Sequence, residues 1–249
     1  MLRVSFHIGI VVFLTLLSQV GGIAWLVAVA FRWRLLVFTA LYAGLSVSVL
    51  FLAPQFGRVA LPCLTDETLR VQPWVFCALN RQYVVPELRD VLVDAASDVA
   101  ARHPGSVTVV LDAGFPFFDG FPLLPHLSHD DGRKADIALY YQKGGAYLTG
   151  TTRSPIGYFA FEQGPSACPP ARATMRWDMR FLQPLWPDYT LEPERTRLAL
   201  QLLASDGRVG RIFIEPHLKT RLQVAHPKVR FQGCRAARHD DHIHVELTR

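Results

Sequence analysis

Residues 238–247 read RHDDHIHVEL, and residues 125–141 read PHLSHDDGRKADIALYY. Each segment joins a cluster of histidines and aspartates to residues typical of a β-strand. Alternate residues of a strand share a face, so His242 and His244 project to the same side, with their Cα atoms about 6.6 Å apart. Asp136 stands at the start of the other predicted strand. The two segments therefore predict a sheet that carries imidazole and carboxylate groups on one face.

This combination of side chains is a reasonable ligand set for zinc. The loop that contains Gly132 gives the chain room to fold His129 back toward Asp136. Two histidines and one aspartate leave the fourth tetrahedral position open, as in catalytic zinc sites. Zinc lowers the pKa of bound water and polarises carbonyl oxygens, so such a site can hydrolyse an amide. Whichever of His242 and His244 is not a ligand suits proton transfer or oxyanion stabilisation.

Each cluster taken alone is typical of a solvated polar loop, and only the two together indicate a site. His103, His217 and His226 stand alone in the sequence, which is typical of surface or core histidines. Other catalytic patterns are missing from the sequence: there is no Gly-x-Ser-x-Gly motif around Ser128, no glycine-rich phosphate loop and no His-Glu-x-x-His.

At these residues the chain resembles the zinc peptidases grouped with lysostaphin, the D-alanyl-D-alanine metallopeptidases and the hedgehog signalling domain. Their shared pattern is a histidine, six residues, an aspartate, and later His-x-His. The resemblance implies one zinc ion bound by His129, Asp136 and His244, with His242 as the catalytic or transition-state-stabilising imidazole.

The chain is still more similar to the penicillin-insensitive murein endopeptidases, which carry His-x-x-His before the aspartate and His-x-x-His-x-His at the end. His126 completes the first pattern and His239 the second. The stretches LPHLSHDDG, VGRIFIEPHLKTRL and HDDHIHVEL resemble that family in order and character, so the likeness covers roughly residues 120–247. It implies a catalytic role for His239 beside His242, and a pocket role for His126 or, less favoured, a second metal site.

The resemblance implies an enzyme that cuts peptide cross-links beside D-amino acids in peptidoglycan. The free carboxylates of such stems need cationic recognition, for which the candidates are Arg133, Arg153 and Arg172. The Arg133–Lys134 pair just before Asp136 departs from the family pattern, in which a less charged sequence is expected. A carboxypeptidase on the same substrate and a non-catalytic, metal-stabilised cell-wall binding domain are the alternatives.

The first 54 residues carry only three charged side chains, Arg3, Arg32 and Arg34. Residues 4–31 and 35–54 are uncharged, and each stretch is long enough to cross about 30 Å of hydrocarbon as a helix. They predict a membrane anchor, residues 1–54, made of a transmembrane hairpin with a tight turn at residues 32–34. A cleaved signal peptide, with a small-residue site at residues 28–30, is the alternative, although the apolar run is longer than usual.

Two arginines in the turn favour a cytoplasmic turn with both termini outside, whereas Arg3 argues for the reverse. We expect a multi-pass protein of the cytoplasmic membrane, in contact with lipid, with its catalytic domain on the extracytoplasmic side. The four cysteines, Cys63, Cys77, Cys168 and Cys234, all follow the anchor and form no Cys-x-x-Cys pair. Two disulfides in an oxidising compartment are plausible, with four unpaired thiols as the alternative and the pairing left open.

Of the 26 basic residues, three lie in the anchor, which leaves 23 against 21 acidic residues beyond it. The remaining chain shows no basic run with interleaved aromatics, so we predict no nucleic-acid partner. Residues 55–84 are expected to form a linker-like entry segment, and residues 85–249 the zinc peptidase domain.

Within that domain, apolar residues at three- and four-residue intervals predict helices from Val85 to about Arg102 and over residues 191–205. A further helix is expected from Pro216 to about Val224. Strands are expected at residues 106–112, 137–141, 209–214 and 242–247, with another between Gly144 and Phe161. Because strands and helices do not alternate regularly, the fold class is predicted to be α+β, a small antiparallel sheet with flanking helices.

Overall fold

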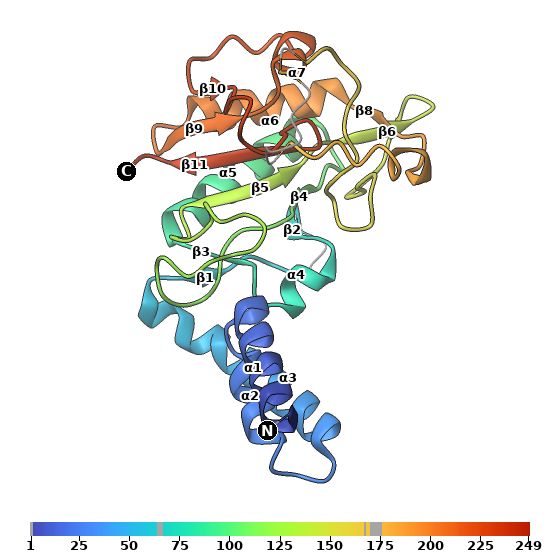
Figure 1. Cartoon of the computed structure of the whole chain (residues 1–249). Helices are drawn as coiled ribbons and strands as arrows, with labels where there is room; N and C mark the ends of the chain where they lie inside the picture. Colours follow the sequence, from blue (N-terminus) through green and yellow to red (C-terminus); the bar gives the residue numbers. More distant parts are fainter. Residues whose placement is uncertain (1, 64–66, 167, 170–175) are drawn as a thin grey trace.

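The structure is a computed structural model that describes residues 2–63, 67–166, 168–169 and 176–249 (Figure 1). Its α-helices in these ranges are α1 (Leu2–Ser18), α2 (Gly21–Ala28), α3 (Arg34–Leu52), α4 (Trp74–Ala78), α5 (Pro86–Arg102), α6 (Pro193–Ser205) and α7 (Pro216–Arg221). Two short 3₁₀ helices are η1 (Ala53–Phe56) and η2 (Gln183–Leu185). The mixture of helices with small sheets confirms the predicted α+β class.

In the described part of the chain the strands form three sheets. The six-stranded sheet contains β2 (Leu69–Val71), β4 (Thr108–Val110), β5 (Lys134–Ala138), β9 (Val209–Phe213), β10 (Val229–Arg230) and β11 (His242–Leu247). The smaller sheets contain β1 (Val59–Ala60) with β3 (Tyr83–Val84), and β6 (Tyr141–Lys143) with β7 (Ala146–Tyr147) and β8 (Thr190–Leu191).

The six-stranded sheet is mixed, where the sequence predicted an antiparallel one. Its strand order is β10-β9-β11-β5-β4-β2; the contacts among β9, β11, β5 and β4 are antiparallel, but the outer pairs β10–β9 and β2–β4 are parallel. Parallel neighbours require a crossover connection. The chain makes one through α4 and α5 between β2 and β4, and another through α7 between β9 and β10.

The structure also differs from the expectation for residues 55–84, which were predicted to be a linker. They contain β1, β2, α4 and β3, and β2 is an edge strand of the main sheet. Leu69 and Val71 of β2 are buried in the same core as α5. A strand of three residues is too short to produce a recognisable alternation, which is why the sequence pattern did not indicate it.

Strands β5 and β11 separate the core from the polar face of the sheet. In β11, Ile243 and Val245 belong to the hydrophobic core, and the alternate residues His242 and His244 project to the opposite face. The register places His244 directly opposite Asp136 of β5. The pairing of the two strands therefore brings an imidazole and a carboxylate from distant parts of the chain together.

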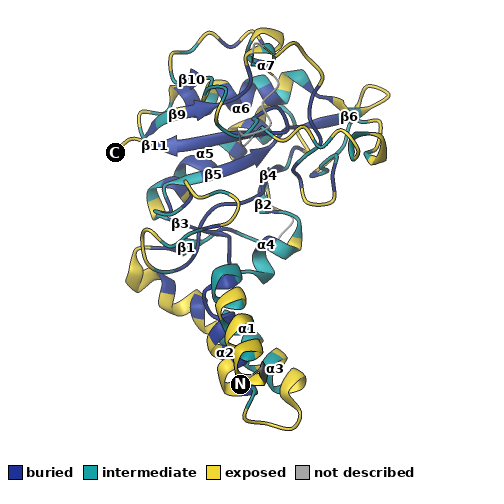
Figure 2. Ribbon diagram, in the orientation of Figure 1, coloured by how far each residue is buried: buried dark blue, intermediate teal, exposed yellow. Residues whose placement is uncertain are grey.

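Helices α5 and α6 contact each other and cover one side of the main sheet (Figure 1). Both helices begin with proline at the first turn, where the missing N–H is not needed. Their apolar residues, including Leu88, Leu92, Leu200 and Leu203, are buried against the strands, and Figure 2 shows this buried layer in dark blue. The opposite side of the sheet carries His242 and His244 and is covered by loops.

Two disulfides are present, Cys63–Cys77 and Cys168–Cys234, which confirms the predicted number and settles the pairing. The first connects the segment after β1 to α4. The second joins Cys168 to Cys234, and the pocket residues Trp177 and Arg238 follow these two cysteines in the chain. Extracytoplasmic compartments allow such bonds to persist, so they favour that location for the domain.

The apolar N-terminal segment forms three helices where the sequence predicted two. The predicted helix over residues 4–31 is interrupted between Ser18 and Gly21, where Gln19 adopts a left-handed backbone conformation with a φ of 60°. Helix α2 then packs back against α1. A Cβ atom at Gly22 would collide with the Thr15 side chain, so glycine permits this close approach.

Within the described part of the chain, one helix is both long and apolar enough to cross a membrane, Arg34–Phe56, with 23 residues. It comprises α3 and η1. The predicted multi-pass arrangement is not supported, because α1 and α2 are each shorter than a full span. The physical reason is the break at Gln19, which divides one long uncharged stretch into two short helices.

Candidate metal centre

The polar face of the main sheet carries a buried cluster of histidines and aspartates. Asp136 comes from β5, His242 and His244 from β11, and His129 from the loop before β5. His129 Nε2 lies 3.4 Å from Asp136 Oδ1 and 3.2 Å from His244 Nδ1. His244 Nδ1 lies 2.8 Å from the same Asp136 oxygen. One potential ligand atom from each of three separate segments therefore lies within 3.4 Å of the other two.

A second grouping shares two of these residues. Ligand atoms of His126, His129 and Asp136 all lie within 4.8 Å of one another, so this group could hold a metal ion. His126 Nδ1, however, faces the other Asp136 oxygen, Oδ2, at 3.3 Å, and lies 3.1 Å from Asp112 Oδ2. The two groupings thus use opposite edges of the Asp136 carboxylate.

The imidazoles nearest Asp136 Oδ1 are oriented by neighbouring acceptors. His129 Nδ1 lies 2.7 Å from the carbonyl oxygen of Ala113, and His244 Nε2 lies 3.2 Å from Glu246 Oε1. Metal-ligating histidines commonly donate their other N–H to such partners, which fixes the ring orientation. These bonds leave His129 Nε2 and His244 Nδ1 directed at the shared carboxylate.

His242 is held by a different carboxylate. Its Nδ1 lies 2.6 Å from Asp241 Oδ1, while Asp241 Oδ2 accepts a hydrogen bond from the Phe159 backbone N–H at 2.6 Å. The Nε2 atom of His242 lies 3.6 Å from Asp136 Oδ1. Asp241 therefore orients His242 so that its other nitrogen faces the cluster.

The far edge of the Asp136 carboxylate is also bonded. The hydroxyl of Tyr158 donates to Asp136 Oδ2 at 2.8 Å. The neighbouring Asp112 carboxylate is paired with the guanidinium of Arg81, which donates from both Nε and Nη2. The Asp112 charge is thus balanced within the protein, and burial together with the nearby carboxylates raises the pKa of Tyr158 well above its usual value.

Burial and neighbouring charges shift the pKa values of Asp136, His129 and His244 in different directions. Burial alone would raise the pKa of Asp136, but the adjacent His129, His242 and His126 hold it well below the usual value. Burial lowers the pKa of His129 more than the charge of Asp136 raises it. The pKa of His244 is raised because hydrogen bonds to two carboxylates outweigh its burial. The shifts favour an ionised Asp136 and a neutral His129, the forms that bind metals, whereas His244 has to release its proton to become a ligand.

His242 and His239 differ in charge. Burial disfavours the cationic form of His242, but Asp136 and Asp241 outweigh it and raise its pKa to about 9. His239 is buried with its ring centroid 4.9 Å from that of His242, and burial together with the neighbouring imidazoles lowers its pKa well below the usual value. At pH 7 a charged His242 therefore lies beside a neutral His239.

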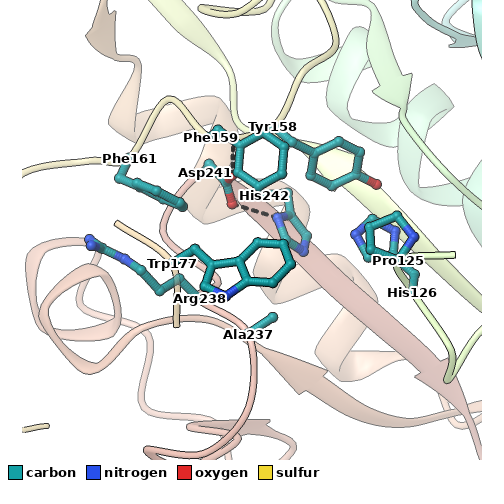
Figure 3. Close-up of a pocket in the computed structure, with 10 residues that line it drawn as sticks. All are labelled: Pro125, His126, Tyr158, Phe159, Phe161, Trp177, Ala237, Arg238, Asp241 and His242. Carbon is teal, nitrogen blue, oxygen red and sulfur yellow. Dashed lines mark hydrogen bonds and ion pairs between the residues drawn. The ribbon is translucent and has the colours of Figure 1, made fainter. Parts of the chain in front are cut away.

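A pocket opens at His242 (Figure 3). Its volume is about 60 Å³, and its lining is mainly aromatic, with Tyr158, Phe159, Phe161 and Trp177 contributing side chains. In the view of Figure 3, Trp177 and Phe161 lie on one side of His242, and Tyr158 and His126 on the other. The pocket therefore connects the outside to the buried cluster.

Of the arginines predicted to bind substrate, the two that the structure describes, Arg133 and Arg153, do not line this pocket. The Arg133 guanidinium donates to the Thr248 carbonyl at 2.6 Å and lies 3.3 Å from Glu87 Oε2. Arg153 is bonded to Glu162 at 3.0 Å, and Arg172 lies outside the described residues. A cation that the sequence pattern did not single out, Arg238, lines the pocket instead.

Several supporting residues had no recognisable signal in the sequence. Tyr158, Trp177 and Asp112 reach the cluster or its pocket from loops and strand ends with no motif around them. Asp241 is different, because it lies inside the RHDDHIHVEL segment. Its place next to His242 could have predicted that it bonds this imidazole.

No family model matches the chain, and a search of the curated proteins found no match. A functional assignment therefore depends on the geometry of the site itself.

Proposed function

We propose that the protein is a membrane-anchored zinc metallo-endopeptidase that hydrolyses D-amino-acid-containing peptide cross-links of peptidoglycan. The observation that carries the proposal is the convergence of His129 Nε2, His244 Nδ1 and Asp136 Oδ1, which are 2.8–3.4 Å apart. Ligands at zinc–nitrogen and zinc–oxygen distances near 2 Å in a tetrahedron are separated by about 3.3 Å. The spacing thus fits one zinc ion.

In this proposal His129, Asp136 and His244 hold the metal, and His126 shapes the pocket. A second ion between His126 and Asp112 is disfavoured because Arg81 already balances the Asp112 charge. A zinc ion bound by the three ligands would supply a nucleophilic hydroxide near neutral pH and polarise an amide carbonyl.

The protein's own contribution centres on His242. Its Nε2–H is directed toward the cluster by the bond between Nδ1 and Asp241. A positively charged imidazole so placed stabilises the negative charge that develops on the carbonyl oxygen, and it can donate a proton to the departing amine. His239, the second proposed catalytic residue, lies beside it as a neutral imidazole, with the two ring centroids 4.9 Å apart.

The pocket supports a peptide substrate that carries a carboxylate. The Arg238 guanidinium lies over the Phe161 ring at 4.1 Å and is bonded to Asp240, so it is held at the rim in a fixed position. The aromatic lining offers apolar surface to a peptide stem, and the guanidinium offers two parallel donors to a terminal carboxylate. We therefore propose Arg238 for this role in place of Arg133 and Arg153, which are bonded elsewhere.

We further propose that the anchor holds the domain outside the cytoplasmic membrane. Arg32 and Arg34 line the same hollow as Phe6 and His7 of α1, and Arg3 precedes these residues on the same helix. The break at Gln19 thus places all three arginines at the end distant from the domain. The positive-inside rule then puts that end in the cytoplasm, and the two disulfides agree with an extracytoplasmic domain.

A Tyr158→Phe variant is expected to bind zinc about 10- to 100-fold more weakly than the wild type. The substitution removes only the hydroxyl that donates to Asp136 Oδ2, so the ligand carboxylate loses its support while the ring packing remains. Competition with a chromophoric chelator measures the affinity. Tyr189→Phe, outside the cluster, is the matched control. An unchanged zinc affinity in Tyr158→Phe would show that the Tyr158 hydroxyl does not support the ligand carboxylate.

The proposed activity is tested with the purified full chain in detergent and cross-linked muropeptides. We expect about one zinc per chain by elemental analysis, and mass spectrometry should find cross-linked dimers converted to monomers with a new amino group. Chelation should stop the reaction and zinc should restore it. Release of a single terminal D-residue would support a carboxypeptidase instead, and zinc binding without cleavage would support a cell-wall binding domain.

A further inference from the structure

A buried ion pair adjoins the pocket and contacts neither the metal cluster nor its ligands. The Arg176 guanidinium donates from Nη1 to Glu215 Oε1 at 3.1 Å and from Nη2 to Glu215 Oε2 at 2.8 Å. The two side chains are 7% and 2% exposed, and the guanidinium also lies over the Phe231 ring, 5.5 Å from its centroid. A bidentate pair of this kind fixes the orientation of both side chains as well as their separation.

The arginine of this pair belongs to the segment that covers the pocket. Arg176 directly precedes Trp177, whose indole lines the pocket (Figure 3). Trp177 is 49% exposed, so packing holds the indole only in part. Further along the chain, the Gln183 side-chain oxygen accepts a hydrogen bond from the Phe161 N–H at 3.2 Å. Residues 176–183 therefore form a roof segment that is held at one end by the ion pair and at the other by Gln183.

The carboxylate of the pair is bonded to the backbone of His239. The Glu215 N–H donates to the His239 carbonyl at 2.9 Å, and Glu215 Oε1 accepts from the His239 N–H at 3.4 Å. Glu215 lies between β9 and α7, so the sheet and a helix fix its backbone on either side. One carboxylate oxygen thus receives both Arg176 Nη1 and the N–H of a proposed catalytic histidine.

We propose that Arg176 and Glu215 are positioning residues that fix the Trp177 roof of the pocket and the backbone of His239 relative to each other. The inference rests on the proposed function of the site and deepens it, because it makes the roof segment part of the catalytic geometry. A peptide held against the indole then meets His239 at a constant distance. Misplacement of a reacting group by about 1 Å can cost about 10²-fold in rate, so such a link has a measurable effect.

Two double variants separate the two contacts of Glu215 without leaving a buried charge unpaired. Arg176→Met with Glu215→Gln removes the ion pair but keeps an amide oxygen that can accept from the His239 N–H. Arg176→Met with Glu215→Leu removes that acceptor as well. The matched control is Arg195→Met with Glu192→Gln, which neutralises a pair 3.6 Å apart at the start of α6.

The first measurement does not depend on activity. The full chain is labelled with 5-fluorotryptophan and purified in detergent, and fluorine NMR follows the Trp177 resonance, which is identified by its absence in Trp177→Phe. We expect this resonance to shift and narrow in both Arg176 double variants, because the indole becomes more mobile, and to stay unchanged in the control. Arg176→Lys, which keeps the charge and loses the bidentate geometry, should give a smaller shift and serves if a double variant does not fold. An unchanged Trp177 resonance in the folded variants would overturn the inference.

Steady-state kinetics on cross-linked muropeptides gives the second measurement. In the Glu215→Gln double variant we expect the KM to rise about 5- to 10-fold, as loss of an aromatic contact does, and kcat to change less than about 2-fold. In the Glu215→Leu double variant kcat should also fall, by about 10-fold. Equal losses in the control pair, or an unchanged KM in both variants, would overturn the positioning role. A shifted Trp177 resonance in a protein whose wild type cuts no muropeptide would support the link and overturn only the proposed peptidase.

Discussion

A His129→Ala variant is expected to lose bound zinc, from about one ion per chain to none, and to lose cleavage of cross-linked muropeptides completely. His129 Nε2 is one of the three proposed ligand atoms, and the two ligands that remain are fewer than the three protein ligands of a catalytic zinc site. Elemental analysis of purified protein and mass spectrometry of the digest measure the two losses.

Two further variants make this result specific. His226→Ala alters a half-buried histidine outside the cluster and should retain both metal and activity. His126→Ala should also retain the metal, because His126 faces the other edge of the Asp136 carboxylate. If His126→Ala emptied the site while His244→Ala did not, the ion would belong to the His126, His129 and Asp136 group, and the ligand set given above would be wrong.

His242→Ala should show the opposite combination. The variant should keep about one zinc per chain, because His242 is not among the three proposed ligands, and its turnover should fall about 10²- to 10⁴-fold, the usual contribution of a positioned acid or base. The KM should change little if the imidazole acts on the transition state. Steady-state kinetics on a purified muropeptide, with zinc content measured on the same sample, separates these quantities.

An Asp241→Asn variant serves as the companion measurement. It should retain the position of His242 approximately but weaken the stabilisation of its charged form, since the Asp241 carboxylate is bonded to His242 Nδ1 at 2.6 Å. Turnover intermediate between wild type and His242→Ala is expected. Full activity in His242→Ala with zinc bound would remove the catalytic role from this residue.

The sequence predicted those parts of the fold whose signals are local. The helices α5 and α6 have regular apolar spacing, and β11 alternates strictly between histidines and branched residues, so each was recognisable from its own segment. Convergence of His129 and His244 could be expected only from the resemblance, because 115 residues separate them in the chain. The β5–β11 register that brings Asp136 opposite His244 is a tertiary property.

The parts that sequence reasoning missed have equally physical reasons. Strand β2 is three residues long and joins the sheet through neighbours that lie far away in sequence, so no periodicity marks it. The interruption at Gln19 occurs inside a stretch whose hydropathy is uniform, and hydropathy alone does not detect a change of direction. Tyr158 and Arg238 reach the site from irregular loops, whose conformation depends on the whole domain.

The order of strands along the chain has a consequence for biogenesis. Central strand β11 follows all its neighbours in the chain, so a ribosome synthesises it after α1–α3 and after every other strand of the six-stranded sheet. Until β11 inserts between β9 and β5, neither His242 nor His244 has a place beside Asp136. In the proposed anchored form, the apolar helices α1–α3 therefore leave the ribosome before the centre can assemble, and a metal ion would be acquired only in the compartment where the domain completes its sheet.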